Sequence, residues 1–467
     1  MFSNLFDPSI DVVCDEDFIL AEINEFRTSR RRQKMLDGQR YFCGQHDILT
    51  RQRTVIGENG KPEEVYNLPN NRVVDNQYAK MVTQKNNYLL GKPFSFRCGN
   101  TAYSDLLYGI MGREFRRVLK SVGEDSLNCG IGWLFVYYDE FGELRFKRLN
   151  PFEIIPEWAD EEHTELDCAI RVYEVTEFTK CFGRLSGKRV EKVEVYSKRG
   201  IFYYVLDGGR LKPTAPFFEN YFSVAGPEVG ERSGWNWERI PLVPFRCNAK
   251  EIPLIERVKT LQDGLNSIES NFQNIMEEDV RNSILVLVNY DGEDLASFRR
   301  NLAEYGVVPV RTVDGSAGDV RSLKIEVNSE NYRTILELFK KGIVENAMGY
   351  DARDDRISGA PNELNLRSMY SDIDLDANSM ETEFQAAFER LLWFVNAHLA
   401  NIGAGEFEGE RLDVIFDRDI LMNEGEVIEN CKKSVGLISD ETIVAMHPWI
   451  SDPAEEMRRL KKGGKSG

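Results

Sequence analysis

Two long helical patterns, separated by a short segment that lacks their periodicity, constrain the fold of this 467-residue chain most strongly. Between Leu254 and Ile275, apolar residues recur at alternating intervals of four and three residues. This is the 3.5-residue repeat of a helix that packs along its length. A second amphipathic pattern spans 328–349, with Asn328 or Ser329 as the N-cap. Two such helices return the chain to the side from which it started, so the intervening residues 282–327 should lie at one end of a stalk.

The segment between the two helices is predicted to be a small α/β insert. Strand patterns at 284–288, 307–313 and 320–327 surround a turn at Asp291-Gly292 and a short helix at 295–305. The repeat at 254–275 does not by itself distinguish between a core helix of a bundle, a two-stranded coiled coil and a helix that packs in a ring.

The residues before the stalk predict helices followed by antiparallel strands. Helical patterns span 16–48, 71–90 and 103–128, with a polar loop at 49–70. A β-hairpin is predicted at 130–149, with its turn at 139–142, and further strands are predicted at 166–176, 189–197 and 200–206. The fold class is therefore α+β.

After the stalk, the sequence predicts a loop, a long helix and a helical C-terminus. Residues 350–362 are polar and charged, and the helical pattern that follows extends from 363 to 400. A strand is predicted at 412–416, and Ser439 should cap a short helix beyond it. The last ten residues are basic.

Charge and composition exclude several classes of protein. The formal net charge is −18, whereas a protein that grips DNA over its whole surface should be basic. The charge remains compatible with a protein that surrounds DNA and lets it slide. No apolar run is long enough for a transmembrane helix, and the first residues do not resemble a secretory signal. The eight cysteines are scattered singly, so we expect free thiols.

No motif in the sequence predicts a catalytic, metal or cofactor site. Residues 183–189 resemble a phosphate-binding loop but have the wrong spacing, and a β-turn is the better interpretation. The series Asp372-x-Asp374-x-Asp376 with Glu383 partly matches a calcium loop, but Ala377 stands where the turn needs glycine. An acidic stripe on a solvated helix face is the expectation here. The four histidines lack metal-ligand spacing, and His398 is interpreted as a packed histidine.

Five short patterns, in order along residues 25 to 460, resemble the portal proteins of tailed phages, in the family typical of siphophages of Gram-positive hosts. The patterns are Lys34-Met35-x-x-Gly38-x-x-Tyr41-x-x-Gly44-x-His46-x-Ile48; Asn70-Asn71-Arg72-x-Val74-x-Asn76 with Tyr88-Leu89-Leu90-Gly91-Lys92-Pro93; Ile240-Pro241-x-Val243-Pro244-Phe245-x-x-Asn248; Leu261-Gln262-Asp263-x-x-Asn266-x-x-x-Ser270-Asn271; and Gly436-x-Ile438-Ser439-x-x-Thr442 with Asp452-Pro453-x-x-Glu456. Their order and spacing together make the resemblance specific.

The resemblance implies a portal architecture and a division of the chain. The expected parts are an N-terminal segment 1–24, a wing 25–252, stem helices 253–281 and 328–349, a clip 282–327, a tunnel loop 350–362, a long tunnel helix with the wing return 363–425, and a crown with the basic tail 426–467.

The resemblance also implies a function, which is not enzymatic. Portals of this family form a ring, dodecameric in the virion and with thirteen subunits possible in isolation, at one capsid vertex. Double-stranded DNA passes through it during packaging and ejection. The implied partners are the terminase large subunit, the head-completion adaptor and the major capsid and scaffolding proteins, with no membrane and no cofactor. The implied location is the virion, and the host cytoplasm during assembly.

Two groups of residues are the expected contact sites. In the tunnel loop, the residues expected to meet DNA are Arg353, Asp354, Asp355, Arg356 and Asn362. In the clip, the residues expected to meet the motor or the adaptor are Glu293, Asp294, Arg299 and Arg300. For the clip residues, a solvated helix face is the competing interpretation.

Two alternatives to a portal remain open at this stage. One is a metal-dependent DNA-processing enzyme with an acidic site near Asp372–Glu383. The other is a coiled-coil scaffold without a pore.

Overall fold

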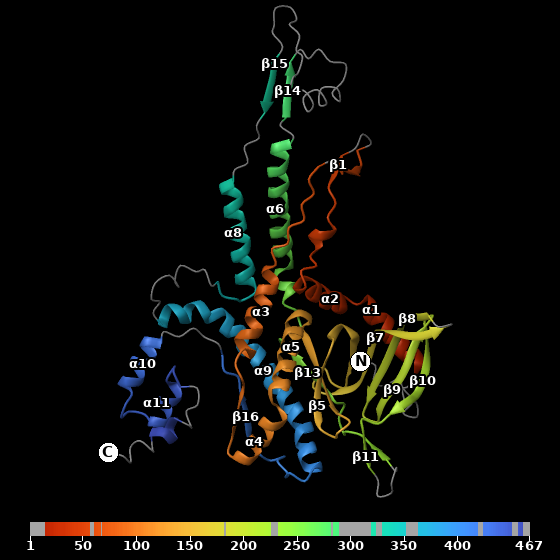
Figure 1. The fold of residues 1–467 in the computed structure, drawn as a ribbon, viewed down its shortest axis with the longest axis vertical. Helices are drawn as coiled ribbons and strands as arrows, with labels where there is room; N and C mark the ends of the chain where they lie inside the picture. The colour runs from red at the N-terminus through yellow and green to blue at the C-terminus, as the bar shows by residue number, and fades with distance from the viewer. Residues whose placement is uncertain are drawn as a thin grey trace, which may run out of the picture. The chain divides into compact units, whose positions relative to one another are not determined.

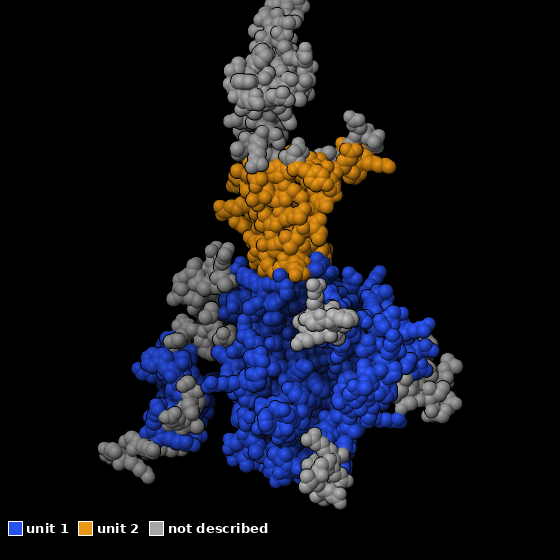
Figure 2. Space-filling view, turned by 45° about the vertical axis from the view of Figure 1, so that its right-hand side comes forward, with its two compact units in different colours: residues 1–43, 78–258, 344–467 blue, residues 44–77, 259–343 orange. Residues whose placement is uncertain are grey.

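A computed structural model of the chain describes most of its residues (Figure 1). The described ranges are 15–56, 60–66, 68–181, 184–225, 232–281, 284–288, 319–323, 329–351, 363–418, 424–450 and 456–460. They form two compact units, coloured separately in Figure 2. Unit 1 comprises residues 1–43, 78–258 and 344–467, and unit 2 comprises 44–77 and 259–343.

Unit 1 contains two antiparallel sheets that carry most of its core. The larger sheet has the strand order β10-β9-β8-β7-β6, and the smaller has the order β13-β4-β5. Their strands are β4 (Ile131–Tyr138), β5 (Leu144–Leu149), β6 (Ile154–Trp158), β7 (Leu166–Cys181), β8 (Arg184–Ser197), β9 (Gly200–Asp207), β10 (Arg210–Glu219) and β13 (Leu242–Arg246). Two short pairs accompany them, β11 (Phe222–Ala225) with β12 (Arg232–Trp235), and β3 (Ser95–Cys98) with β16 (Leu412–Ile415). The predicted hairpin at 130–149 and the three further strands are confirmed.

Helices pack against these sheets through their apolar faces. In α1 (Glu16–Thr28), Ile19 and Ile23 contact the larger sheet in a cluster with Ile155, Ile170 and Val193. The other helices of this unit are α2 (Arg30–Phe42), α3 (Gln77–Leu90), α4 (Thr101–Ile110), α5 (Arg113–Cys129), α9 (Glu363–Asn401), α10 (Glu424–Lys433) and α11 (Asp440–Met446). Side chains of α9 such as Phe384 and Phe388 are fully buried and contact Phe245 of β13.

Two glycines allow α5 to lie unusually close to its neighbours. A Cβ on Gly38 of α2 would lie 1.9 Å from the carbonyl oxygen of Asn128. Gly130, which ends α5 with φ of 87°, would place a Cβ 2.0 Å from the carbonyl oxygen of Glu251. Only glycine combines that left-handed backbone with such a close approach.

Unit 2 is built on an antiparallel helix pair, α6 (Ile255–Arg281) and α8 (Ser329–Asn346) (Figure 1). Phe339 of α8 packs on Gly264 of α6, where a Cβ would lie 2.4 Å from the ring. Farther along, the rings of Phe272 and Tyr332 have centroids 4.8 Å apart. Strands β14 (Ile284–Val288) and β15 (Asp319–Leu323) pair between the helices in sequence, as predicted for the insert. The predicted helix at 295–305 and strand at 307–313 lie outside the described residues.

Three predicted helices are wrong in extent. The pattern at 16–48 is broken at Ser29, whose hydroxyl caps α2 by accepting from the Arg32 N–H. The pattern at 103–128 is broken at Gly112, which precedes α5. The helix predicted from residue 71 begins only at Gln77, because the preceding backbone groups bond to α6 side chains instead.

Other predictions from the sequence are confirmed or corrected here. The helix at 363–400 is α9, the strand at 412–416 is β16, and the Ser439 hydroxyl accepts from the Thr442 N–H as a cap. The stretch 184–189 is part of strand β8 rather than a β-turn, so the resemblance to a phosphate loop has no structural basis. Six cysteines are free: Cys43, Cys98, Cys129, Cys168, Cys247 and Cys431. No helix among the described residues is long and apolar enough to cross a membrane.

Candidate functional site

All of the residues that the sequence predicts to touch DNA or a partner lie outside the described residues. These are Arg353, Asp354, Asp355, Arg356 and Asn362 of the loop, and Glu293, Asp294, Arg299 and Arg300 of the clip. The structure does describe the chain on both sides of 352–362. It also describes the helix pair of unit 2. These two regions are the candidate site.

The chain entering the loop is fixed to α3. The Tyr350 N–H donates to the side-chain oxygen of Gln84 at 3.0 Å, and the Gln84 amide donates back to the Tyr350 carbonyl at 2.8 Å. The ammonium of Lys85 donates to the Met348 carbonyl at 3.1 Å. A Cβ on Gly349 would lie 2.7 Å from the sulfur of Met81. This close packing and the reciprocal amide bonds hold residues 348–350 in one place.

The chain leaving the loop is fixed to the same helix. Met369, Tyr370, Ile373 and Ala377 of α9 form one buried cluster with Tyr88 of α3, and Tyr350 packs against it. The ring of Tyr370 lies 4.7 Å from that of Tyr350 and 5.9 Å from that of Tyr88, measured between centroids. The described residues on both sides of 352–362 therefore pack against α3.

Ion pairs anchor the acidic residues of α9 beside this cluster. Asp376 accepts from Lys85 of α3 at 2.7 Å and from Arg257 at 2.8 Å. Asp374 accepts from the Tyr88 hydroxyl at 2.7 Å and pairs with Arg418. These contacts tie the first half of α9 to α3, to the start of α6 and to the segment after β16.

The charges at this site are set by burial and by pairing together. Burial acts to raise the pKa of Asp376, but Lys85 and Arg257 outweigh it, so the pKa lies below its usual value. Burial lowers the pKa of Lys85, and the attraction of Asp376 offsets only part of that effect. Burial, followed by the hydrogen bond to Asp374, raises the pKa of Tyr88. Asp376 is therefore a carboxylate near neutral pH.

The expected solvated acidic stripe is wrong for most of its members. Asp376 and Glu383 are mostly buried, and Glu383 pairs with Arg246 at 2.6 Å. Asp372 is exposed as expected. The residues lie within α9 rather than in a calcium-binding turn. Within the described ranges, no three His, Cys, Asp or Glu side chains are placed to hold a metal ion.

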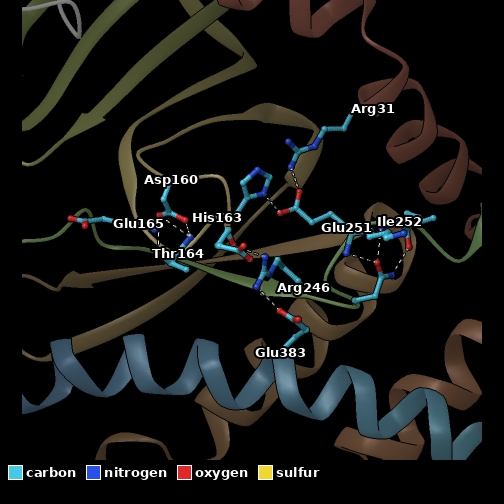
Figure 3. Close-up of polar contacts among 12 residues, drawn as sticks. Arg31, Asp160, His163, Thr164, Glu165, Arg246, Glu251, Ile252 and Glu383 are labelled. Atoms are coloured by element: carbon cyan, nitrogen blue, oxygen red, sulfur yellow. Dashed lines mark hydrogen bonds and ion pairs between the residues drawn. The ribbon is translucent and has the colours of Figure 1, made fainter. Parts of the chain in front are cut away.

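A second polar network fixes the chain just before α6 (Figure 3). Glu251 is nearly buried and accepts from Arg31 of α2 at 2.5 Å, and its other oxygen lies 2.7 Å from Nδ1 of His163. Arg246 of β13 contacts Glu383 of α9 in the same region. Within unit 1, the segment that leads into α6 is thereby held by contacts from three directions.

In unit 2, a polar ladder joins α6 to the extended segment 71–75. Gln262, Asn266, Ser270 and Asn274 occur at every fourth position of α6 and are at most 3% exposed. The Gln262 amide donates to the Asp75 carbonyl at 2.7 Å, and Asn266 accepts from the Asp75 N–H at 3.1 Å. Ser270 accepts from the Val73 N–H at 2.9 Å, and Asn274 accepts from the Asn71 N–H at 2.7 Å.

The ladder connects sequence patterns that lie about 200 residues apart in the chain. The pattern around Asn71 supplies the backbone groups, and the pattern around Asn266 supplies the side chains. His46, from the first pattern, is buried with Nδ1 2.8 Å from the Asn266 amide nitrogen. Several residues of the family-like patterns therefore act together here, in joining α6 to the extended segment 71–75.

Sequence reasoning missed the residues that anchor the loop. Lys85 is the clearest case, because a lysine among the apolar positions Val82, Tyr88 and Leu89 of a buried helix face requires a carboxylate partner. That signal was available, but it does not say which of 77 acidic residues is the partner. The interpretation of His398 is confirmed: it is buried, with Nδ1 3.1 Å from the Tyr138 hydroxyl.

Comparison with known proteins agrees with the resemblance in the sequence. Residues 26–466 match the family model described as phage portal protein, SPP1 Gp6-like. The portal protein of Bacillus phage SPP1 is 27% identical over 433 residues, covering 92% of this chain and 83% of the relative. The portal protein of Clostridium phage phiCD119 is 27% identical over 441 residues, covering 92% of each chain.

A solved structure described as the neck of an empty GTA particle, computed with C6 symmetry, is also similar. It shares 12% sequence identity and covers 78% of this chain and 88% of its own, with a TM-score of 0.39. The family match spans nearly the whole chain, including the anchored loop ends and the ladder. The chain therefore belongs to the SPP1 Gp6-like family of phage portal proteins.

Proposed function

We propose that this chain forms the ring-shaped channel at one capsid vertex through which double-stranded DNA is packaged and later ejected. In this proposal the terminase large subunit docks first and the head-completion adaptor replaces it. The protein acts in the virion after assembly in the host cytoplasm, where it meets the scaffolding and major capsid proteins. Membership of the portal family supports the role.

The observation in this chain that carries the proposal furthest is that three cations of the helix pair are each held by a carboxylate. Lys259 of α6 pairs with Asp47 at 2.6 Å, and Lys340 of α8 pairs with Asp75 at 2.6 Å. Arg333 pairs with Glu337 at 2.9 Å. A cation held by a carboxylate gains less from a phosphate, so a wall of such pairs binds DNA weakly. Weak binding suits DNA that must slide.

The size of a ring of such helices also fits DNA. Twelve helices of diameter about 10 Å, packed side by side around one axis, have their own axes on a circle with a circumference of roughly 120 Å. The diameter of that circle is about 38 Å, and subtracting one helix thickness leaves a bore of about 28 Å. A DNA duplex of about 20 Å passes with little space to spare. The net charge of −18 per chain adds repulsion rather than adhesion at the wall.

Electron microscopy of the purified full-length chain tests the proposal directly. We expect closed annular particles of 12 or 13 copies with a central hole. A folded chain that remains a monomer or dimer under all conditions would refute the channel and favour the pore-less scaffold. Metal-dependent DNA cleavage lost in Asp374→Asn would instead favour an enzyme, although Asp374 is already occupied by Tyr88 and Arg418.

The tunnel loop is proposed to contact the DNA backbone through Arg353 and Arg356. Replacing both with alanine should change the packaging velocity or the retention of packaged DNA. The matched control removes two exposed cations of α5, Arg113→Ala with Lys120→Ala, and should leave both quantities unchanged. Equal behaviour of the two double variants would contradict a special role for the loop.

The clip is proposed to bind the terminase and the adaptor through Glu293, Asp294, Arg299 and Arg300. The variant Arg299→Ala/Arg300→Ala should weaken terminase binding to intact rings in a pull-down or surface-binding measurement. Unchanged binding would support the competing interpretation, in which these side chains form a solvated helix face.

A further inference from the structure

Unit 1 contains a large open hollow. Its volume is about 1550 Å³, and it lies among the turn after β4, the β11–β12 hairpin, the end of α9 and the segment that follows α9. Such a volume exceeds the roughly 300–1,000 Å³ of usual small-molecule pockets. The hollow is therefore large enough for several residues of another polypeptide. We call it the acidic hollow.

Aromatic rings form the apolar part of the acidic hollow. Trp237 stacks on Tyr138 with centroids 5.4 Å apart, and its ring lies 5.0 Å from Phe222 and 6.4 Å from Trp393. Trp235 and Ile402, which also line the hollow, are 57% and 59% exposed. Large apolar side chains gathered around one concave surface mark a site of interaction rather than scattered surface residues.

The polar part of the acidic hollow has one sign of charge. None of the described lining residues is lysine or arginine. Six of them are acidic: Asp139, Glu140, Glu219, Glu238, Glu406 and Glu408. Asp139 already pairs with Arg145, and Glu219 accepts from Tyr203. Glu406 and Glu408 are exposed and form no ion pair within the described part of the chain. Burial lowers the pKa of His398, so this histidine adds no positive charge near neutral pH.

One contact beside the hollow indicates which ligand chemistry its rings accept. The guanidinium carbon of Arg239 lies 4.8 Å from the ring centroid of Trp393. A cation over an indole is stabilised by the negative face of the ring. Carboxylates around aromatic rings therefore attract lysine and arginine, and they repel the phosphates of DNA.

We propose that the acidic hollow binds a short cationic peptide segment of a partner protein. Its lysine or arginine side chains pair with Glu406 and Glu408, and its apolar side chains pack on Trp235 and Ile402. Charge complementarity and the exposed rings select this occupant. The proposal does not depend on the passage of DNA through the ring.

The test uses full-length chain assembled as purified and two labelled synthetic peptides of twelve residues. One peptide alternates lysine with leucine, and the other alternates glutamate with leucine. Fluorescence polarisation should show saturable binding of the first peptide at one per chain and no binding of the second. Equal binding of both peptides would mean that only apolar contact matters, which overturns the proposal.

Variants locate the site of peptide binding. Glu406→Gln/Glu408→Gln should weaken binding about tenfold, since two ion pairs at a partly desolvated surface are lost. Trp235→Ala should weaken it to a similar extent. The control Glu161→Gln/Glu174→Gln neutralises two exposed carboxylates outside the hollow, and Trp449→Ala removes an exposed tryptophan elsewhere. Circular dichroism confirms that each variant is folded.

Two further outcomes overturn the proposal. If the control variants weaken binding as much as the hollow variants, the peptide binds through overall charge and not at this site. If dissociated chains bind the peptide but assembled rings do not, a second copy of this chain covers the hollow instead of a partner protein.

Discussion

The ammonium group of Lys85 lies 2.7 Å from a carboxylate oxygen of Asp376, and only 3% of the lysine side chain is exposed. These residues are 291 positions apart in the chain. The same ammonium also holds the Met348 carbonyl at the entrance of the proposed tunnel loop. One buried cation thus fixes the backbone on one side of the loop and the long helix on the other.

Asp376→Asn should destabilise the fold more than Lys85→Met. Removal of the carboxylate charge leaves Lys85 buried without a counter-ion, which costs about 3–5 kcal/mol of unfolding free energy. Removal of the lysine leaves Asp376 paired with Arg257, so the loss should be smaller. Urea unfolding followed by circular dichroism measures both. The exposed pair Arg333–Glu337 provides the control, because Arg333→Met should cost less than about 1 kcal/mol.

The polar ladder predicts that an apolar substitution on a helix can destabilise it. Asn266→Leu leaves the half-buried Asp75 N–H without its acceptor, at a cost of about 1 kcal/mol. Amide hydrogen exchange at Asp75 and Val73 should become faster. Gln273→Leu, on the exposed face of the same helix, should leave those exchange rates unchanged. Similar rates in both variants would show that the ladder contributes nothing to stability.

Gly130→Ala and Gly142→Ala separate crowding from backbone strain. Both glycines have positive φ, 87° and 77°, but only Gly130 meets another backbone atom. Gly142→Ala should therefore cost about 1–2 kcal/mol from its left-handed conformation alone. Gly130→Ala must in addition displace the Glu251 carbonyl, so its midpoint of thermal unfolding should fall much further. Equal shifts of the two midpoints would contradict the close approach.

Glu157 of β6 should make the unfolding free energy depend on pH. Burial, followed by the nearby Glu22, Glu25 and Asp167, raises the pKa of Glu157 to about 7. The folded state then binds more protons than the unfolded state between about pH 4.5 and 7. Its contribution to stability is present at low pH and is lost as the pH rises through this window.

Replacing this carboxyl group removes the pH effect. Glu157→Gln should stabilise the protein by about 1 kcal/mol at pH 8 relative to the parent chain, with no gain at pH 5. Chemical denaturation at the two pH values measures the difference. The control Glu174→Gln, at an exposed position of β7, should change the unfolding free energy by the same amount at pH 5 and at pH 8. A gain of equal size at pH 5 and pH 8 would exclude titration of Glu157 as the cause.

The repeat at 254–275 shows how far periodicity can be trusted. It correctly predicts a helix, because the spacing of apolar residues follows backbone geometry. It does not predict that the positions of α6 at Gln262 and Asn266 are fully buried. Polar residues on a helix are usually assigned to solvent, and their burial depends on backbone groups from a distant extended segment. The sequence around Gln262 and Asn266 does not indicate which distant segment supplies those backbone groups.

The sequence predicts where in the chain the candidate site lies, but not which side chains contact one another there. The helix predicted at 363–400 follows from the spacing of its apolar residues and is α9, whereas residues 352–362 of the predicted loop lie outside the described residues. The ion pairs of the acidic residues do not follow from the sequence, because Glu383 pairs with Arg246 of β13 and Asp374 pairs with Arg418 beyond β16. Which carboxylate meets which arginine is decided by topology, so the expectation of a solvated stripe was wrong for Asp376 and Glu383, whereas Asp372 is exposed as expected. The expected contacts of Arg353 and Arg299 remain predictions.

The ladder between α6 and residues 71–75 works because two different step lengths nearly coincide. Four helical residues advance about 6.0 Å, and two extended residues advance about 6.6 Å. The difference of roughly 0.6 Å per step adds up along the helix, so only a few successive side chains can stay within hydrogen-bond distance of the extended segment. Deleting one residue from α6 would also turn the side chains beyond it by about 100°, and deleting one from the extended segment would point the alternate N–H groups away from α6. Insertions and deletions should therefore be excluded from both segments, while substitutions that preserve hydrogen bonding are tolerated.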